Sequence, residues 1–457
     1  MKKTCTMPVI SALILITNIT VAYANTSDSI TSSEQADSST VILTLQDAIK
    51  IAMSENITVK IADKEIERCK YAKKGTYAAL FPKIDANAVY NRTIKKQVMY
   101  IDFGKMPKMK DGIEVGRYNT YNAGISASMP LVNMQLWKSL EISGGDVEMA
   151  VEKARSSKIE MIAMVKQSYY SVLLAKEVLN VYRNEYANAV SNAEKTQMLY
   201  KAGKASDLDM SRAETNKANI VPNLYNAENA ITLALWQLKA VMGIDLEKNI
   251  DIAGRLKDYA EHMFYDTHKY DSVSVANNSS IRQLALQSEQ LAKTIKMQTY
   301  AYIPTLAANF SYSINAMSND FKFNEYRWTP HSYVGVSLSI PLFSAGKRYY
   351  NIAVAKVQNV ELNLKRTDTE RQLKIAVKQY LNNMETAMKS YISSEKAVEL
   401  AEKAYNISEK AYSIGKNTIT DLNDSRFMLT KAKLAESQAI FNFISAKNNL
   451  EKTIGSL

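Results

Sequence analysis

Two segments of this chain, Met134–Lys201 and Lys347–Ile414, contain no proline. The first has only the glycine pair Gly144-Gly145, and the second has no glycine at all. Each segment is therefore expected to be one uninterrupted helix, and at about 1.5 Å per residue each would extend roughly 100 Å. A helix of that length exceeds the diameter of a small globular domain, so the sequence predicts an elongated helical assembly.

Within both segments, large and small side chains alternate along one helix face in steps of three and four residues. A period near 3.5 residues is typical of coiled-coil packing. The expected seam of the first segment consists of Val165, Ser168, Val172, Ala175, Leu179, Tyr182, Tyr186, Ala189, Ala193, Thr196 and Tyr200. That of the second consists of Val377, Tyr380, Met384, Ala387, Tyr391, Ser394, Val398, Ala401, Tyr405, Ser408 and Tyr412. Pro222, in the helix expected after the first segment, should kink or locally interrupt that helix.

The sequence is also duplicated. Asn56–Pro82 and Asn278–Pro304 have the same spacing, GISASMPLVN recurs as GVSLSIPLFS, and YKAGK recurs as YSIGK. Each half is expected to run as helix, strand, loop, strand, very long helix, turn and long helix. The predicted units are a first repeat at 44–242 (strands at about 84–130, turn near 203), a connector at 243–275, and a second repeat at 276–457 (strands at about 306–341, turn near 415).

The N-terminus carries the features of a secretory signal peptide. Lys2 and Lys3 precede an apolar stretch, and Ala22-Tyr23-Ala24 is a small-x-small cleavage site. Residues 1–24 are therefore predicted to be removed, and the polar residues that follow make 25–43 a flexible leader. Only Cys69 then remains, so no disulfide within the chain is expected.

The four expected strands alternate between apolar and polar side chains. In 84–91, Ile84, Ala86, Ala88 and Tyr90 share one face, and the segments near 306–314, 122–129 and 334–340 follow the same rule. Such alternation over about ten residues is typical of a lipid-facing barrel strand. Aromatic residues near the strand ends fit an interfacial girdle; they are Tyr90, Tyr118, Tyr121, Tyr326, Trp328 and Tyr333.

Four strands cannot close a barrel, and in lipid no strand edge is left open. Several chains must therefore pool their strands. The predicted fold class is mainly α with membrane β-hairpins: a long α-helical coiled-coil barrel plus a β-barrel shared by three subunits, with four strands per chain. A tube of that length would cross most of the gap between two membranes, which favours transport as its purpose.

Catalysis and nucleic-acid binding find little support in the sequence. The formal charge of +11 comes from lysines spread along the helices, which indicates a solvated surface. His262, His268 and His331 form no recognised metal set, although His262 and His268 with Asp266 are a weak alternative. No phosphate loop or dinucleotide fingerprint is present, so we expect no enzyme activity, no cofactor and no metal.

The duplicated order, the strand-ending motifs PLVN and PLFSAGKR, and the turn sequence YSIGKNTITDLNDSR resemble the TolC-like outer-membrane efflux proteins. The resemblance covers nearly the whole chain after the signal peptide. It implies a homotrimer in the outer membrane that extends into the periplasm as an exit duct for efflux or type I secretion. It also implies opening at the periplasmic tip by a periplasmic adaptor protein and an inner-membrane pump.

The two predicted helix turns contain the candidate docking residues. Gly203 and Gly415 follow the long helices, where a left-handed residue ends a helix. The resemblance adds that these turns meet the adaptor, which would place Gly203, Lys204, Gly415 and Lys416 at a docking surface. Helix termination alone remains the alternative for the two glycines.

Acidic residues follow both turns in capping-box spacing. Ser206-x-x-Asp209 and Thr418-x-x-Asp421 predict helix N-caps, and Asp424 lies on the same helix face as Asp421. The resemblance implies that Asp421 and Asp424 line a closed pore as stacked carboxylate rings that favour cations. Asp209 and Tyr412 are further candidates for this constriction. Capping is favoured for Asp209 and the pore for Asp424, and Tyr412 is a candidate for locking the tip. Asn417 stands where well-studied family members carry a basic residue.

Two other classes of protein stay open at this point. A periplasmic coiled-coil adaptor or binding protein would need short strands that are exposed to solvent on both faces. A trimeric surface stalk would need neither the twofold repeat nor lipid-facing strands. The apolar strand faces disfavour both alternatives.

Overall fold

The computed structural model describes residues 40–100, 112–261, 263 and 274–457. The predicted signal peptide, the predicted leader up to residue 39, and His262, Asp266 and His268 lie outside the described residues. Among the helices described, none combines the length and apolar character needed to cross a bilayer.

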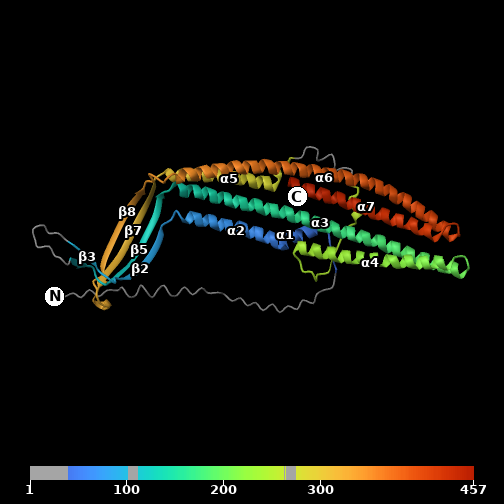
Figure 1. The fold of residues 1–457 in the computed structure, drawn as a ribbon, viewed down its shortest axis with the longest axis horizontal. Coiled ribbons are helices and arrows are strands. Elements are labelled where there is room, and N and C mark those ends of the chain that lie inside the picture. Colours follow the sequence, from blue (N-terminus) through green and yellow to red (C-terminus); the bar gives the residue numbers. More distant parts are fainter. Residues whose placement is uncertain (1–39, 101–111, 262, 264–273) are drawn as a thin grey trace, which may run out of the picture. The chain divides into compact units, whose positions relative to one another are not determined.

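The described elements follow the order expected for a duplicated chain (Figure 1). The first half contains β1 (Val41–Leu43), α1 (Leu45–Glu55), α2 (Ile57–Ala78), β2 (Lys83–Arg92), β3 (Gln97–Met99), β4 (Ile113–Val115), β5 (Asn119–Val132), α3 (Met134–Lys201) and α4 (Asp207–Met242). The second contains β6 (Ile250–Ile252), the 3-10 helices η1 (Leu256–Tyr259) and η3 (Val275–Asn277), α5 (Ser279–Thr299), η4 (Tyr300–Tyr302), β7 (Thr305–Ser318), η5 (Phe323–Glu325), β8 (Thr329–Ser339), α6 (Lys347–Ser413) and α7 (Ile419–Ile454).

The main sheet has the order β2-β5-β7-β8, and all its pairs are antiparallel. Its register brings apolar side chains to one face, because Ala127 of β5 lies opposite both Ile84 of β2 and Phe310 of β7. Phe310 in turn lies opposite Val334, whose side chain is 82% exposed. The other face is polar. The predicted alternation is confirmed, and most of the apolar face is left uncovered in one chain.

The outer strands of this sheet, β2 and β8, each pair on one side only within the described chain. The sheet is therefore open, with two free edges that present unpaired backbone groups. A four-stranded sheet is too narrow to curl onto itself, since about eight strands make the smallest useful barrel. The predicted fold class, in which one chain supplies only part of a barrel, is confirmed.

The two long helices are continuous, with 68 residues in α3 and 67 in α6. Helix α3 packs along α4, and α6 packs along α7 (Figure 1). Many residues of the predicted seams are buried, and Val165 of α3 and Met384 of α6 are completely so. At the tip, the seam residues Thr196 and Tyr412 contact each other across α3 and α6. Helix α4 continues through Pro222, so the predicted local interruption does not occur. Proline removes one backbone donor, and packing against α3 supports the turns on either side.

Helices α4 and α2 meet end to end through Asn56. Its Oδ1 accepts a hydrogen bond from the backbone N–H of Thr58 (2.7 Å), which caps α2, while its Nδ2 donates to the carbonyl of Val241 (2.7 Å) near the end of α4. Asn278 makes the same two bonds between α5 and α7, to Ser280 N–H (2.8 Å) and the Thr453 carbonyl (2.7 Å). Each half therefore pairs one continuous helix with a column of two stacked helices.

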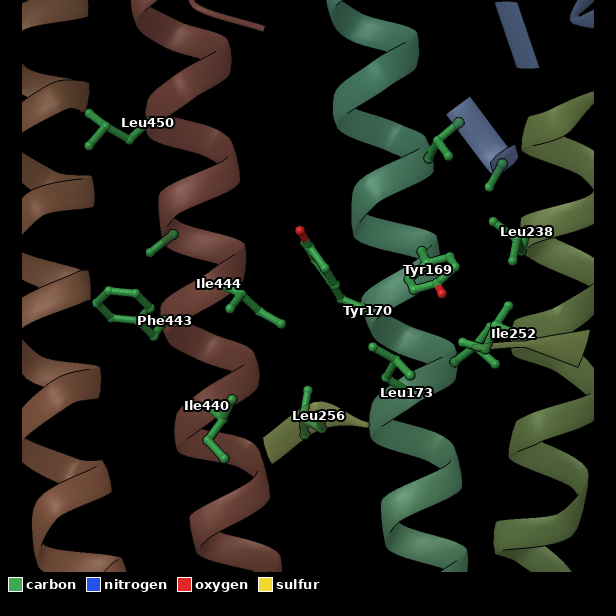
Figure 2. Packing of buried hydrophobic residues seen from close by; sticks show 14 of the residues in the cluster. Tyr169, Tyr170, Leu173, Leu238, Ile252, Leu256, Ile440, Phe443, Ile444 and Leu450 are labelled. Atoms are coloured by element: carbon green, nitrogen blue, oxygen red, sulfur yellow. The ribbon is translucent and has the colours of Figure 1, made fainter. Parts of the chain in front are cut away.

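The largest core lies where these columns join. Figure 2 shows Tyr170 and Leu173 of α3 facing Ile440 and Ile444 of α7, with Leu256 of η1 beside them. These side chains are all buried. The core connects the two halves of the chain at the level of the stacked-helix junctions.

Two details of the sequence analysis require correction. The predicted flexible leader extended to residue 43, but Val41–Leu43 form β1, which pairs in parallel with β6. Tyr169 holds this pair by donating a hydrogen bond from its hydroxyl to the Ala253 carbonyl (2.6 Å). Tyr333, one of the aromatic residues predicted for the girdle, lies on the polar face of the sheet, because its partner in the register is Ser311.

Candidate functional site: the helix turns

Both long helices end in the same left-handed turn. Gly203 and Gly415 have φ values of +70° and +71°. The N–H of Lys204 donates to the Leu199 carbonyl (2.8 Å), and the N–H of Lys416 donates to the Ala411 carbonyl (2.8 Å). This arrangement is the Schellman motif, which satisfies the last carbonyls of a helix. The predicted helix-terminating role of both glycines is confirmed.

The space in front of both glycines is open. A Cβ atom added at Gly203 or Gly415 would meet no heavy atom within 4 Å. The Lys204 and Lys416 side chains are exposed and form no ion pair within the described part of the chain. The turns therefore present a small, accessible backbone surface with an uncompensated positive charge beside each glycine.

The outgoing helices begin with the two predicted capping boxes. In the first, Ser206 Oγ accepts from the Asp209 N–H (3.1 Å), and Asp209 Oδ2 accepts from the Ser206 N–H (3.1 Å). Thr418 and Asp421 repeat this exchange at 3.2 and 3.0 Å. The hydroxyls of Ser206 and Thr418 also donate to these carboxylates and hold the pKa of Asp209 and of Asp421 below its usual value. Both aspartates therefore serve as caps.

Asp424 differs from these two aspartates. Its side chain is exposed and has no hydrogen-bond or ion-pair partner among the residues that the structure describes. It lies one turn beyond the capping box, so no local structural role accounts for it. This carboxylate is free to act on something outside the chain.

Tyr412 lies inside the tip rather than on its surface. The side chain is 7% exposed, and its hydroxyl forms a buried 2.7 Å hydrogen bond with Thr196 Oγ1 of α3. Lys195 and Glu409 form an ion pair beside it (2.8 Å). Tyr412 therefore ties the end of α6 to α3, which is a locking contact within one chain.

Polar contacts also join the two outgoing helices. Arg212 of α4 donates from Nη1 to Thr420 Oγ1 of α7 (3.4 Å), and Asn216 Nδ2 donates to Asn423 Oδ1 (3.3 Å). Asn417 stands where the TolC-like proteins that the sequence resembles carry a basic residue. Its Nδ2 donates to Ser408 Oγ (3.2 Å) within its own helix pair. The tip is thus held by several weak polar bonds around a small apolar cluster.

The sequence analysis missed a buried charged pair above the tip. Arg426 of α7 is 3% exposed, and its Nε lies 3.9 Å from Glu185 Oε1 of α3. Burial lowers the pKa of Arg426 and raises that of Glu185. The available signal was the position of Arg426 in the apolar stripe that contains Leu422 and Leu429.

No cluster of metal-ligating side chains occurs among the described residues. His331 lies in β8, far along the chain from the turns. Neither observation bears on His262 or His268.

With the open sheet, the duplicated helices and the turns established, comparison with known proteins decides the family. The family model for outer membrane efflux proteins matches residues 48–244 and 272–456. The chain belongs to the outer membrane efflux protein family. Members of this family are outer-membrane channels rather than enzymes, so the predicted resemblance and the outer-membrane localisation are confirmed.

Relatives of this efflux family member are distant but nearly full length. Outer membrane protein TolC of Vibrio cholerae is 22% identical over 387 residues, covering 83% of each chain. The alkaline protease secretion protein AprF of Pseudomonas aeruginosa is 20% identical over 417 residues, covering 91% of this chain and 85% of AprF.

Solved structures agree on the fold. The CmeC outer membrane channel of Campylobacter jejuni superimposes with a TM-score of 0.70 at 16% identity, covering 90% of this chain and 85% of CmeC. The open state of the MtrE outer membrane channel of Neisseria gonorrhoeae gives a TM-score of 0.67 at 18% identity, covering 90% and 88%.

Proposed function

We propose that three copies of this chain form a periplasm-spanning exit duct for efflux or type I secretion. The observation that carries the proposal is the open sheet with an exposed apolar face, connected directly to helices of 68 and 67 residues. Lipid tolerates neither free strand edges nor uncovered polar backbone, so β2 of one chain must pair with β8 of another. Three chains would supply twelve strands, which is enough for an open lumen.

The helices support the same assembly. Each helix of this length extends about 100 Å from the sheet, on the scale of the space between the two membranes. The homotrimer would therefore place its turns close to the inner membrane, within reach of a periplasmic adaptor and an inner-membrane pump. The pump and adaptor would select the cargo.

The gate of this duct is proposed to consist of Asp424 and Asp421. Threefold symmetry would turn the unpaired Asp424 into a ring of three carboxylates, which favours cations and binds divalent ions. Asp421 would stand beside that ring, but its carboxylate is already engaged by Thr418. Asp424 is therefore the stronger determinant of the gate, and Asp209 belongs to the cap alone.

Single-channel recording in planar bilayers tests both the duct and its gate. Wild-type protein should give a small, cation-selective conductance that added divalent cations block. Asp424→Asn should lose most of the block, while Asp209→Asn, the same substitution at the capping-box aspartate of the first repeat, should retain it. Channels in which both variants keep the block would remove Asp424 from the gate. A purified chain that forms neither channels nor a heat-resistant trimer would favour the coiled-coil adaptor alternative.

The docking surface is proposed to be the two exposed turns, with Gly203 and Gly415 allowing close approach and Lys204 and Lys416 supplying charge. Photo-crosslinkers at Lys204 and Lys416 in the cell envelope should yield one periplasmic adaptor protein. The same crosslinker at Lys365, which lies in the first third of α6 and far along the helix from the turn, should not. Equal crosslinking at all three positions would contradict docking at the turns.

A further inference from the structure

At one end, the apolar face of the sheet carries a positively charged side chain. Along β2, alternate residues occupy this face in the order Ile84, Ala86, Ala88, Tyr90 and Arg92. The first three are aliphatic, the fourth is aromatic and the last is positively charged. This order runs from the helix-proximal end of the strand to its far end, where the strand enters the loop towards β3.

An aromatic cluster covers the far end of the same face. The rings of Tyr90 and Tyr121 stack with centroids 4.9 Å apart, and the rings of Phe323 and Tyr326 lie 5.3 and 5.6 Å from that of Tyr121. The β7–β8 connection is fixed over the sheet, because Asn119 Nδ2 donates to the Asp320 carbonyl (2.9 Å). The aromatic surface is therefore built and held by specific bonds.

Arg92 lies beside this cluster without a carboxylate partner among the residues that the structure describes. Its guanidinium stands over the Phe321 ring, 5.6 Å from the centroid. Two lysines of the adjoining loops are compensated, since Lys96 pairs with Glu114 (3.5 Å) and Lys322 with Glu325 (3.9 Å). Arg92 thus offers a fork of donors that no carboxylate among the described residues satisfies.

The succession of aliphatic, aromatic and cationic groups matches the layers of one membrane leaflet. Acyl chains contact aliphatic side chains, aromatic rings lie at the interface, and arginine meets the phosphates of the head group. A guanidinium also binds phosphate through two parallel hydrogen bonds, which makes the match specific in geometry as well as in charge.

We propose that Arg92 and the adjoining aromatic cluster bind a phosphate-bearing lipid of the outer leaflet. The leaflet follows from the proposed function, because helices directed into the periplasm leave the Arg92 end of the sheet at the cell surface. The aliphatic residues of β2 would contact the acyl chains, and Tyr90 with Phe321 would flank the sugar or glycerol next to the phosphate.

The test measures lipid retained by the detergent-purified full-length protein in native mass spectrometry, with bisphosphorylated lipid A as the probe. Arg92→Gln should weaken binding about tenfold, because it removes a charge-assisted hydrogen-bond pair. Arg92→Lys should restore part of the affinity. Lys83→Gln, which removes one positive charge from the opposite end and opposite face of the same strand, should bind as the wild type does.

Two results would overturn the lipid site: equal retention by Arg92→Gln and wild type, or equal retention of lipid A and its dephosphorylated form. The proposed duct is judged separately, by bilayer conductance of the same preparations. Arg92→Gln should conduct normally because Arg92 faces away from the polar side of the sheet. Normal conductance with no phosphate preference refutes the lipid site alone, and phosphate-dependent binding without conductance refutes the duct.

Discussion

The junction at Asn278 offers a quantitative test of how the stacked helices are held together. The side chain is 9% exposed and serves two helices at once, as the N-cap of α5 and as a donor to the Thr453 carbonyl of α7. Replacing it with alanine removes a cap worth about 1 kcal/mol. It also leaves a largely buried carbonyl without a donor, which costs about 1–3 kcal/mol. The local free energy of opening should fall by roughly 2–4 kcal/mol.

Hydrogen exchange read by mass spectrometry measures this change in the full-length protein. At about 1.4 kcal/mol per factor of ten, Asn278→Ala should accelerate amide exchange roughly 30- to 700-fold at both the start of α5 and the end of α7. Thr44 caps α1 at an exposed site without bridging a second helix. Thr44→Ala should therefore accelerate exchange only about fivefold, and only in α1.

Asn278→Ser separates the two bonds. Serine keeps an acceptor for the N–H of Ser280 but is too short to reach Thr453, so only the end of α7 should exchange faster. A change in exchange for Asn278→Ala no larger than for Thr44→Ala, or an effect confined to α5, would contradict the bridging role of Asn278. Asn56 makes the equivalent bonds between α2 and α4, and its alanine variant should reproduce the pattern there.

Two further predictions concern the tip and the pair above it. Because the folded-state pKa of Asp209 and of Asp421 is lowered, their caps stabilise fully above the usual value of 3.8 and fade as pH falls through the folded values. Wild type should therefore lose thermal stability between about pH 5 and pH 2, in part through these caps. The double variant Asp209→Asn/Asp421→Asn should lose less thermal stability over the same range. An unchanged pH dependence in the double variant would contradict the capping role of the two aspartates. Arg426→Met should lower the free energy of unfolding by about 3–5 kcal/mol in denaturant, because Glu185 is left buried without its counter-charge. Adding Glu185→Leu should restore most of the lost stability. A double variant as unstable as the single one would show that the pair is not the cause.

The parts of the fold that follow from local periodicity were predictable from sequence. Helix α6 reads as one helix because nothing between Lys347 and Ser413 can break it, and its seam fixes which face is buried. The strands followed from alternation, and the capping boxes from a spacing of three residues. Each of these signals depends only on residues near one another in the chain.

Contacts between distant segments were not predictable in this way. Strand β1 is three residues long and pairs with β6, some two hundred positions later, so no periodic pattern marks either strand. The hydrogen bond of Tyr412 to Thr196 and the proximity of Arg426 to Glu185 depend on how α3 packs against α6 and α7. That packing is set by side-chain shape across helices, for which a single sequence gives no register.

The duplication sharpens the assignment of Asp424 to the gate. Counted from the N-cap residues Ser206 and Thr418, the position of Asp424 in α7 is occupied in α4 by Arg212. Arg212 donates to Thr420 of α7 and is used inside the chain, whereas Asp424 has no partner there among the residues described. The caps have therefore been kept in both repeats because both helices must begin, while the next turn has diverged in charge. At the level of Asp424, a trimer built from these tips would present three carboxylates and three engaged arginines rather than six carboxylates. Mutual repulsion among three carboxylates is smaller than among six, so a closed ring can form without a bound cation and can still attract one.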